Sequence, residues 1–128
     1  MIIGIGIDII EVVRVKRLFD EYGKRFVERV FTEIEIDYCE HMAHPAMHFA
    51  ARFAAKEAFL KAIGTGLTGG ISWREIGIIN EDSGKPQLHY EGKAAEIAKK
   101  LGTNNTYISL SHNKEYATAI VVIENERI

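Results

Sequence analysis

The sequence predicts one α+β domain with an antiparallel sheet. Short runs of alternating apolar residues near both ends of the chain favour strands, whereas apolar side chains at helical spacing fill most of the segments between them. Strands, helices and strands again in one chain are typical of α+β folds. With 128 residues, 47% of them hydrophobic, the chain suits a single domain over residues 1–128 that holds its own core.

The first expected element is a buried strand over residues 1–10. One of its faces consists of isoleucines, namely Ile3, Ile5, Ile7 and Ile9. The other face carries Asp8 after Gly4 and Gly6, which leave room for a ligand or another backbone. Asp8 could equally be the polar residue that ends the strand and hydrogen-bonds its own backbone in a turn.

Two helices are expected after this strand. Residues 11–22 have apolar side chains at helical spacing, and Gly23 is a natural stop. Thr32 and Glu35 have the spacing of a capping box, which predicts a second helix from there to about His41.

The central helix is expected over roughly residues 47–63, after an interruption at Pro45. A glycine-rich connection follows it. We expect the rest to form a hairpin, a short amphipathic helix and a second hairpin. The expected ranges are 73–80 and 86–90 for the first hairpin, 91–101 for the helix, and 107–111 and 116–124 for the second hairpin.

Composition excludes several classes of protein. The net charge of −2 and the pI near 6.2 argue against a nucleic-acid binder. Cys39 is the single cysteine and cannot form an internal disulfide, and the spacing of the histidines near it fits no usual zinc site. The apolar N-terminal run is short, lacks a basic leader and contains Asp8, and no window reaches the roughly 20 apolar residues of a membrane span. We therefore expect a cytoplasmic protein.

Glu57 and Lys61 stand one helical turn apart on a segment otherwise made of alanine and large apolar residues. Side chains at this spacing share one helix face. A carboxylate and an ammonium there, on a helix that runs into Gly64-Thr-Gly66, could serve a metal ion and a phosphate together. An ordinary surface salt bridge is the alternative.

Four motifs in order connect these segments to a known family. They are Gly4-Ile-Gly-Ile-Asp8 with Glu11 and Arg14, residues 52–61 with Gly64-Thr-Gly66, the turn Gly84-Lys-Pro86, and residues 109–117. In this combination the chain resembles the holo-[acyl-carrier-protein] synthases, the short bacterial type of phosphopantetheinyl transferase. The resemblance implies a long central helix packed across a curved sheet, and a homotrimer whose active sites lie between neighbouring subunits.

The resemblance also implies an activity. A serine hydroxyl of an apo acyl carrier protein attacks the β-phosphorus of coenzyme A, which leaves 4′-phosphopantetheine on the serine and releases adenosine 3′,5′-bisphosphate. Asp8 and Glu57 match the positions that hold Mg²⁺, and Lys61 would neutralise a phosphate oxygen. The proton acceptor could be Glu57 or a metal-bound water. Such an enzyme would serve lipid metabolism through fatty acid biosynthesis.

Two further groups of residues follow from the resemblance. Those expected to bind coenzyme A are Arg52, Lys61, Gly64, Gly66, Lys85, Pro86, Ser111 and His112. Acidic carrier proteins would be steered by cations. Arg14 matches a family position that contacts the carrier, and the neighbouring candidates are Arg17, Arg25 and Phe26.

Two alternative functions use the same residues. A magnesium-dependent phosphohydrolase would use Asp8 and Glu57 against a nucleotide diphosphate, with water as the acceptor. A non-catalytic module would bind acidic partners through Arg14, Arg17 and Arg25 without coenzyme A or metal.

Overall fold

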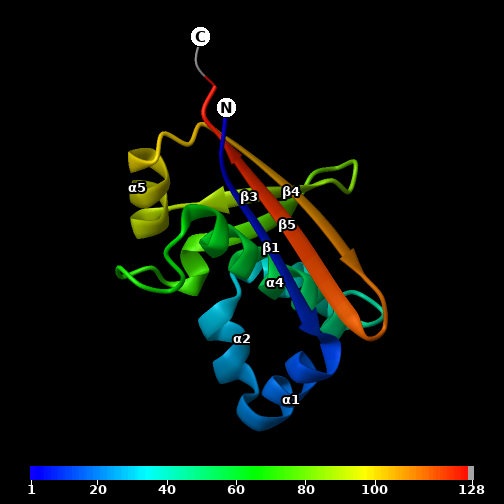
Figure 1. Ribbon diagram of the computed structural model, residues 1–128. Coiled ribbons are helices and arrows are strands. Elements are labelled where there is room, and N and C mark those ends of the chain that lie inside the picture. Colours follow the sequence, from blue (N-terminus) through cyan, green and yellow to red (C-terminus); the bar gives the residue numbers. More distant parts are fainter. Residues whose placement is uncertain (127–128) are drawn as a thin grey trace.

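One long helix packs against a three-stranded sheet in the computed structural model, which describes residues 1–126 (Figure 1). The helix is α4 (Pro45–Ile63). The sheet has the order β1 (Ile2–Glu11), β5 (Tyr116–Glu124) and β4 (Asn105–His112), and both pairings are antiparallel. The predicted α+β class and the antiparallel sheet are confirmed.

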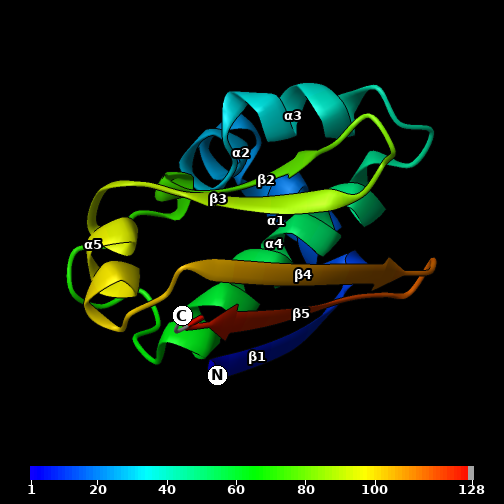
Figure 2. The ribbon, with the colours of Figure 1, turned by 90° about the horizontal axis from the view of Figure 1, so that it is seen from above.

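A second, two-stranded sheet lies beyond β4. It consists of β2 (Ile76–Asn80) and β3 (Pro86–Tyr90), and β3 runs beside β4 in Figure 2. The two sheets curve around α4. The remaining helices are α1 (Val12–Tyr22), α2 (Lys24–Val30), α3 (Glu33–Glu40), a 3₁₀ turn (Trp73–Glu75) and α5 (Gly92–Lys100).

Three local predictions need correction. The sequence left residues 24–30 without an element, whereas they form helix α2, whose apolar side buries Phe26 and Val30. Pro45 does not interrupt the chain before α4 but begins the helix, since its fixed φ suits the first helical position. The expected strand from residue 73 begins with a 3₁₀ turn and becomes extended at Ile76.

The isoleucine face of β1 points away from the core of the chain, contrary to expectation. Ile7, for example, is 62% exposed. The opposite face packs on α4, because an added Cβ at Gly6 would collide with the Ala58 carbonyl oxygen and one at Gly4 with that of Ala62. The glycines therefore let the helix backbone approach the strand. Ile5, Ile7 and Ile9 remain on the outside, whereas Ile3 is partly buried against the core.

A buried ion pair fixes α4 against its neighbours. Lys56 Nζ lies 2.7 Å from Glu35 Oε1 on α3, and both side chains are 0% exposed. Lys56 also donates to the carbonyl oxygens of Trp73 and Ile76, while Glu35 accepts from the Ile78 N–H at 3.0 Å. Within residues 1–126, no helix is both long enough and apolar enough to cross a membrane.

Candidate functional site

Asp8 and Lys61 meet at the edge of the three-stranded sheet. Asp8 lies within β1, opposite Ala119, on the face that packs on α4. Lys61 Nζ donates to Asp8 Oδ1 at 3.0 Å and to the Ile7 carbonyl oxygen at 2.9 Å. In the described part of the chain, Lys61 is paired with Asp8 and makes no ion pair with Glu57, so the expected alternative of a Glu57–Lys61 surface bridge is not what the structure shows.

Glu57 completes a group that we call the carboxylate cluster, made of Asp8, Glu57 and Lys61. The pKa of Glu57 is raised, first because the carboxyl is partly buried and second because the charge of Asp8 acts on it. The charges of Lys61 and Arg14 oppose this rise in pKa. Two carboxylates that repel each other in a half-buried place form a natural position for a cation.

The carboxylate cluster fits Mg²⁺ in one specific way. Mg²⁺ prefers oxygen ligands and commonly takes one or two carboxylates together with phosphate oxygens of a substrate. No group of three or more acidic, histidine or cysteine side chains within residues 1–126 could hold a metal ion by itself. Asp8 and Glu57 therefore suit an ion that shares its coordination with a bound phosphate ligand.

Gly64 ends α4 three residues after Lys61, and Gly66 lies in the turn that follows. Both have positive φ, 81° and 58°, and Gly64 N–H closes the helix on the carbonyl oxygens of Leu60 and Lys61. An added Cβ at either glycine would meet nothing within 4 Å. These glycines leave open backbone at the C-terminal end of α4.

A second site lies on another flank of α4. It is a pocket of about 400 Å³, which we call the arginine pocket, and it brings together four residues predicted to bind coenzyme A, namely Arg52, Lys85, Pro86 and His112. Tyr38, His48 and Asn80 also line it, and sequence reasoning missed them. For His48 a signal existed, because it precedes Arg52 by four residues and so shares its helix face.

Arg52 is the unusual group of the arginine pocket. It is 3% exposed, and its guanidinium lies 4.3 Å from the centre of the Tyr38 ring. Nη2 donates to Asn80 Oδ1 at 2.7 Å, Nη1 reaches the His48 carbonyl oxygen at 3.4 Å, and Nε has no partner among the described residues.

No carboxylate within residues 1–126 forms an ion pair with Arg52. Burying a charge without a counter-ion is costly. The arginine pocket is therefore prepared for an anionic ligand.

The two sites face different directions. Arg52 and Glu57 are five positions apart, which turns their side chains by about 140° around the helix axis. Asp8 lies on β1 and His112 on β4, at opposite edges of the sheet. Ser111 alternates with His112 and shares the outer face of the sheet with Ile9 through their common partner Thr118, so it points away from the arginine pocket.

The residues expected to meet a carrier protein lie on α1 and α2. Arg14, Arg17 and Arg25 are exposed. Phe26 is mostly buried, because its ring packs against the rings of Phe19, Phe31 and Phe53 at centroid distances of 5.5 to 6.2 Å. It also lines a pocket of about 270 Å³, together with Leu18, Tyr22, Arg25 and Arg29.

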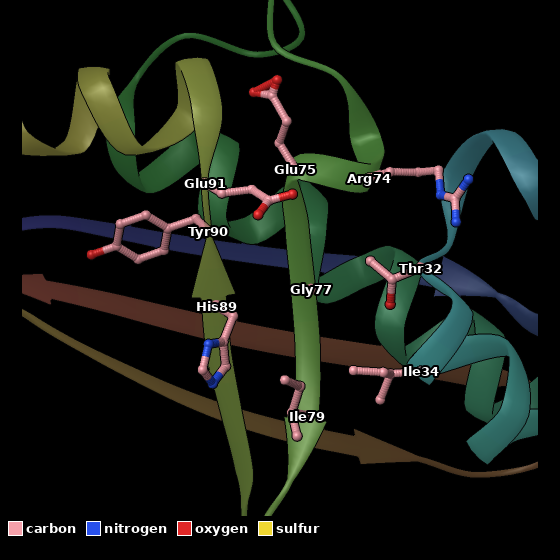
Figure 3. A pocket seen from close by; sticks show the side chains of 9 residues that line it. All are labelled: Thr32, Ile34, Arg74, Glu75, Gly77, Ile79, His89, Tyr90 and Glu91. Atoms are coloured by element: carbon pink, nitrogen blue, oxygen red, sulfur yellow. The ribbon is translucent and has the colours of Figure 1, made fainter.

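A further pocket lies on the β2–β3 side of the molecule and contains none of the predicted residues (Figure 3). Its volume is about 270 Å³, and Glu75, Gly77 and His89 are among the residues that line it. The Glu75 carboxylate already accepts from the Ala94 N–H at 3.1 Å. This acid is thus engaged in the fold, and we place the functional site at the other two positions.

The chain is similar to proteins of a known family. The family model of the 4'-phosphopantetheinyl transferase superfamily matches residues 4–121. The holo-[acyl-carrier-protein] synthase of Koribacter versatilis is 46% identical over 125 residues, covering 98% of this chain and 100% of the relative.

Solved structures of holo-[acyl-carrier-protein] synthases have the same fold as this chain. The holo-[acyl-carrier-protein] synthase from Neisseria meningitidis superposes with a TM-score of 0.89 at 38% identity and covers 98% of this chain and 100% of its own. One from Bacillus anthracis, solved in complex with CoA (3',5'-ADP), has a TM-score of 0.81 at 38% identity and covers 98% and 99%.

Proposed function

The chain belongs to the 4'-phosphopantetheinyl transferase superfamily, and on this basis we propose that it is a holo-[acyl-carrier-protein] synthase. It transfers 4′-phosphopantetheine from coenzyme A to a serine of an apo acyl carrier protein. The observation that carries the proposal is that one helix, α4, presents a carboxylate cluster on one flank and a buried, uncompensated arginine on another. Coenzyme A needs both, because it carries a diphosphate and a separate 3′-phosphate.

The reaction exchanges one phosphorus–oxygen bond for another. The serine oxygen bonds to the β-phosphorus, the bond from that phosphorus to the bridging oxygen breaks, and adenosine 3′,5′-bisphosphate leaves with the bridging oxygen. Mg²⁺ held by Asp8 and Glu57 would draw charge from the diphosphate when bound. Lys61, now paired with Asp8, would donate to a non-bridging oxygen.

Glu57 is the side chain best placed to accept the serine proton, with a water molecule as the alternative acceptor. Burial and the neighbouring charge of Asp8 raise the pKa of Glu57 in the metal-free chain, whereas a Mg²⁺ ion bound to the same carboxylate would act against this rise, so the water molecule has equal weight as the acceptor. The 3′-phosphate would bind in the arginine pocket, where Arg52 and His112 offer donors and Lys85 adds charge at the rim. Gly64 and Gly66 would admit the nucleotide close to the backbone.

The carrier protein would approach α1 and α2. Acyl carrier proteins are acidic, so Arg14, Arg17 and Arg25 would steer and orient the partner. The pocket beside Arg25 and Arg29 would receive an apolar side chain of the carrier. Arg14 also acts on the charge of Glu57, which puts this docking surface next to the carboxylate cluster.

The proposed assembly is a homotrimer that works in the cytoplasm. Its support is the outer face of the three-stranded sheet, where Ile5, Ile7, Ile9 and Ile120 are exposed together. Such an apolar patch is typical of a protein–protein interface. The carboxylate cluster and the arginine pocket lie at opposite edges of this sheet, so neighbouring subunits could join one half-site of each chain.

The assembly can be tested with one charge. Ile7→Asp should dissociate the oligomer, as measured by light scattering after size exclusion, and should abolish transfer. Ile34→Asp is the matched control, since Ile34 is equally exposed on α3 away from this face. A monomeric parent protein with full activity would overturn the proposed trimer.

Mass spectrometry tests the activity directly. Apo acyl carrier protein incubated with coenzyme A, Mg²⁺ and this protein should gain the mass of one phosphopantetheine group. Cleavage of coenzyme A with an unmodified carrier would indicate a phosphohydrolase instead. Binding of the carrier without any chemistry would indicate a non-catalytic module.

A further inference from the structure

Two histidine rings meet at the arginine pocket. His48, on α4, and His112, at the end of β4, have ring centroids 4.9 Å apart at an interplanar angle of 67°. The centroid of the Tyr38 ring, from α3, lies 6.0 Å from that of His48 at an interplanar angle of 76°. His48 lies one helical turn before Arg52 and shares its helix face. The pocket around the guanidinium is therefore lined by potential hydrogen-bond donors from three elements, α3, α4 and β4.

The charges that act on His48 are all positive. The pKa of His48 is lowered, first by burial and then by the charges of His112, Arg52 and His44. Neither α3 nor β4 brings a carboxylate to the pocket lining in the described part of the chain, and no ring nitrogen of His48 or His112 has a hydrogen-bond partner there. The pocket thus holds a buried arginine and two unpartnered imidazoles with no negative charge.

We propose that His48 is a proton-coupled ligand of the phosphate monoester that the arginine pocket takes. The inference rests on the proposed function, in which this ligand is the 3′-phosphate of coenzyme A or of adenosine 3′,5′-bisphosphate. A dianion between His48, Arg52 and His112 supplies the missing negative charge. The His48 ring then takes up a proton and donates a charge-assisted hydrogen bond to a phosphate oxygen.

The sign of the pH dependence follows from this linkage. Without the anion, burial and the cationic neighbours keep His48 neutral at neutral pH. The bound anion raises the pKa of the ring, so binding takes up a proton wherever the pH lies between the two values. The contribution of His48 to affinity grows as pH falls through this window and is absent above it.

Calorimetry with adenosine 3′,5′-bisphosphate tests the inference. The dissociation constant is measured at about pH 6.5 and about pH 8.5, above the second pKa of a phosphate monoester near 6, for the parent protein and for His48→Gln. We expect the variant to bind about tenfold more weakly at the lower pH and almost equally at the higher pH. Titrations in buffers of different ionisation enthalpy should show less proton uptake by the variant.

Two controls isolate the 3′-phosphate. His41→Gln removes an exposed histidine that bonds within α3, and it should keep the parent pH dependence. Adenosine 5′-monophosphate lacks the 3′-phosphate, so its affinity should be unaffected by His48→Gln. Equal pH dependence of the parent and His48→Gln would overturn the inference and leave the proposed function standing. No binding of the bisphosphate to the parent at either pH would overturn the proposed nucleotide site itself.

A second measurement needs no variant. The NMR resonance of the His48 Cε1–H reports protonation of the ring in the parent protein. Its titration midpoint should move to higher pH when adenosine 3′,5′-bisphosphate is bound. An unchanged midpoint in the bound protein would overturn the inference even if His48→Gln failed to fold.

Discussion

Two lysines of α4, five residues apart, each meet a carboxylate, and the two contacts have opposite characters. Lys56 lies 2.7 Å from Glu35 with both side chains fully buried. Lys61 lies 3.0 Å from Asp8, with exposed fractions of 54% for the lysine and 17% for the aspartate. A pair of a lysine and a carboxylate thus occurs twice on this helix. Lys56 and Glu35 form the inner pair, which is buried, and Lys61 and Asp8 form the outer pair, which lies at the surface.

The hydrogen bonds of the two pairs explain the difference. Lys56 also donates to two backbone carbonyls, and Glu35 accepts from the N–H groups of Thr32 and Ile78, so no group of the inner pair is left for a ligand. Lys61 has one further partner, the Ile7 carbonyl oxygen, and keeps water access. A buried pair with complete hydrogen bonding stabilises the fold, whereas an exposed and incomplete pair can exchange its partner for a substrate.

The largest expected effect is on the inner pair. Lys56→Met leaves the Glu35 carboxylate buried without its cation, so the free energy of unfolding should fall by about 3–5 kcal/mol. Urea denaturation of the parent and variant measures the loss. The matched control is Lys61→Met, whose stability should stay within about 0.5 kcal/mol of the parent. A loss below about 1 kcal/mol for Lys56→Met would remove the proposed contrast.

The next largest effect is expected on the transfer rate when Asp8, the acid of the outer pair, is replaced. Asp8→Ala should reduce phosphopantetheine transfer by about 10³-fold or more, because half of the proposed magnesium ligation is lost, while the fold remains. The rate is followed by mass spectrometry of the carrier protein, and folding by circular dichroism. Glu40→Ala, an exposed acid at the end of α3, serves as the control. Near-normal transfer by Asp8→Ala at ordinary magnesium would show that the two-carboxylate site is wrong.

A smaller effect on the rate is expected at Lys61 itself. Lys61→Met should lower turnover by about 10²-fold at saturating magnesium, comparable to the loss of one preorganised donor to a developing charge. Steady-state kinetics of the purified variant measure the change. Turnover within about threefold of the parent would make Lys61 a surface partner of Asp8, and the comparison of the two lysines would then show only a difference in burial.

Sequence patterns predicted the contacts between residues that are close in the chain. The capping box of Thr32 and Glu35 is present as expected, with hydrogen bonds of 2.9 and 3.2 Å. The two ion pairs could not be predicted from the sequence, because the partner of Glu35 lies on α4 and the partner of Lys61 lies on β1. Helical spacing indicated Glu57 as the partner of Lys61, but the close approach of β1 to α4 through Gly6 brings Asp8 nearer.

The same limit applies to the faces of the strands. Period-two alternation identified the two faces of β1 but not which of them meets α4. Gly4 and Gly6 offered room for another backbone on one face, and the contact of Gly6 with Ala58 shows that this backbone is that of α4. The arginine pocket was predicted only in part, because its lining residues come from α3, α4, β4 and the β2–β3 hairpin. No spacing in the sequence indicates that Tyr38 or Asn80 lies near Arg52.

The smallest expected effect is on stability, and it concerns the charge of Glu57 in the carboxylate cluster apart from any role in the reaction. The pKa of Glu57 is raised by burial and by Asp8, so the charged form costs stability at neutral pH in the absence of metal. Glu57→Gln should therefore be slightly more stable than the parent near neutral pH in chelator. The gain should begin to shrink as pH falls below the raised pKa of the folded protein and should vanish at the ordinary glutamate pKa of the unfolded chain, below which Glu57 is protonated in both states. Melting temperatures across this range measure the effect. Added Mg²⁺ with coenzyme A should stabilise the parent more than the variant, since the variant lacks one of the two proposed carboxylate ligands. A variant that is less stable than the parent in chelator would mean that Lys61 and Arg14 already compensate the negative charge of Glu57. The carboxylate cluster would then resemble the inner pair and would not be a site prepared for a cation.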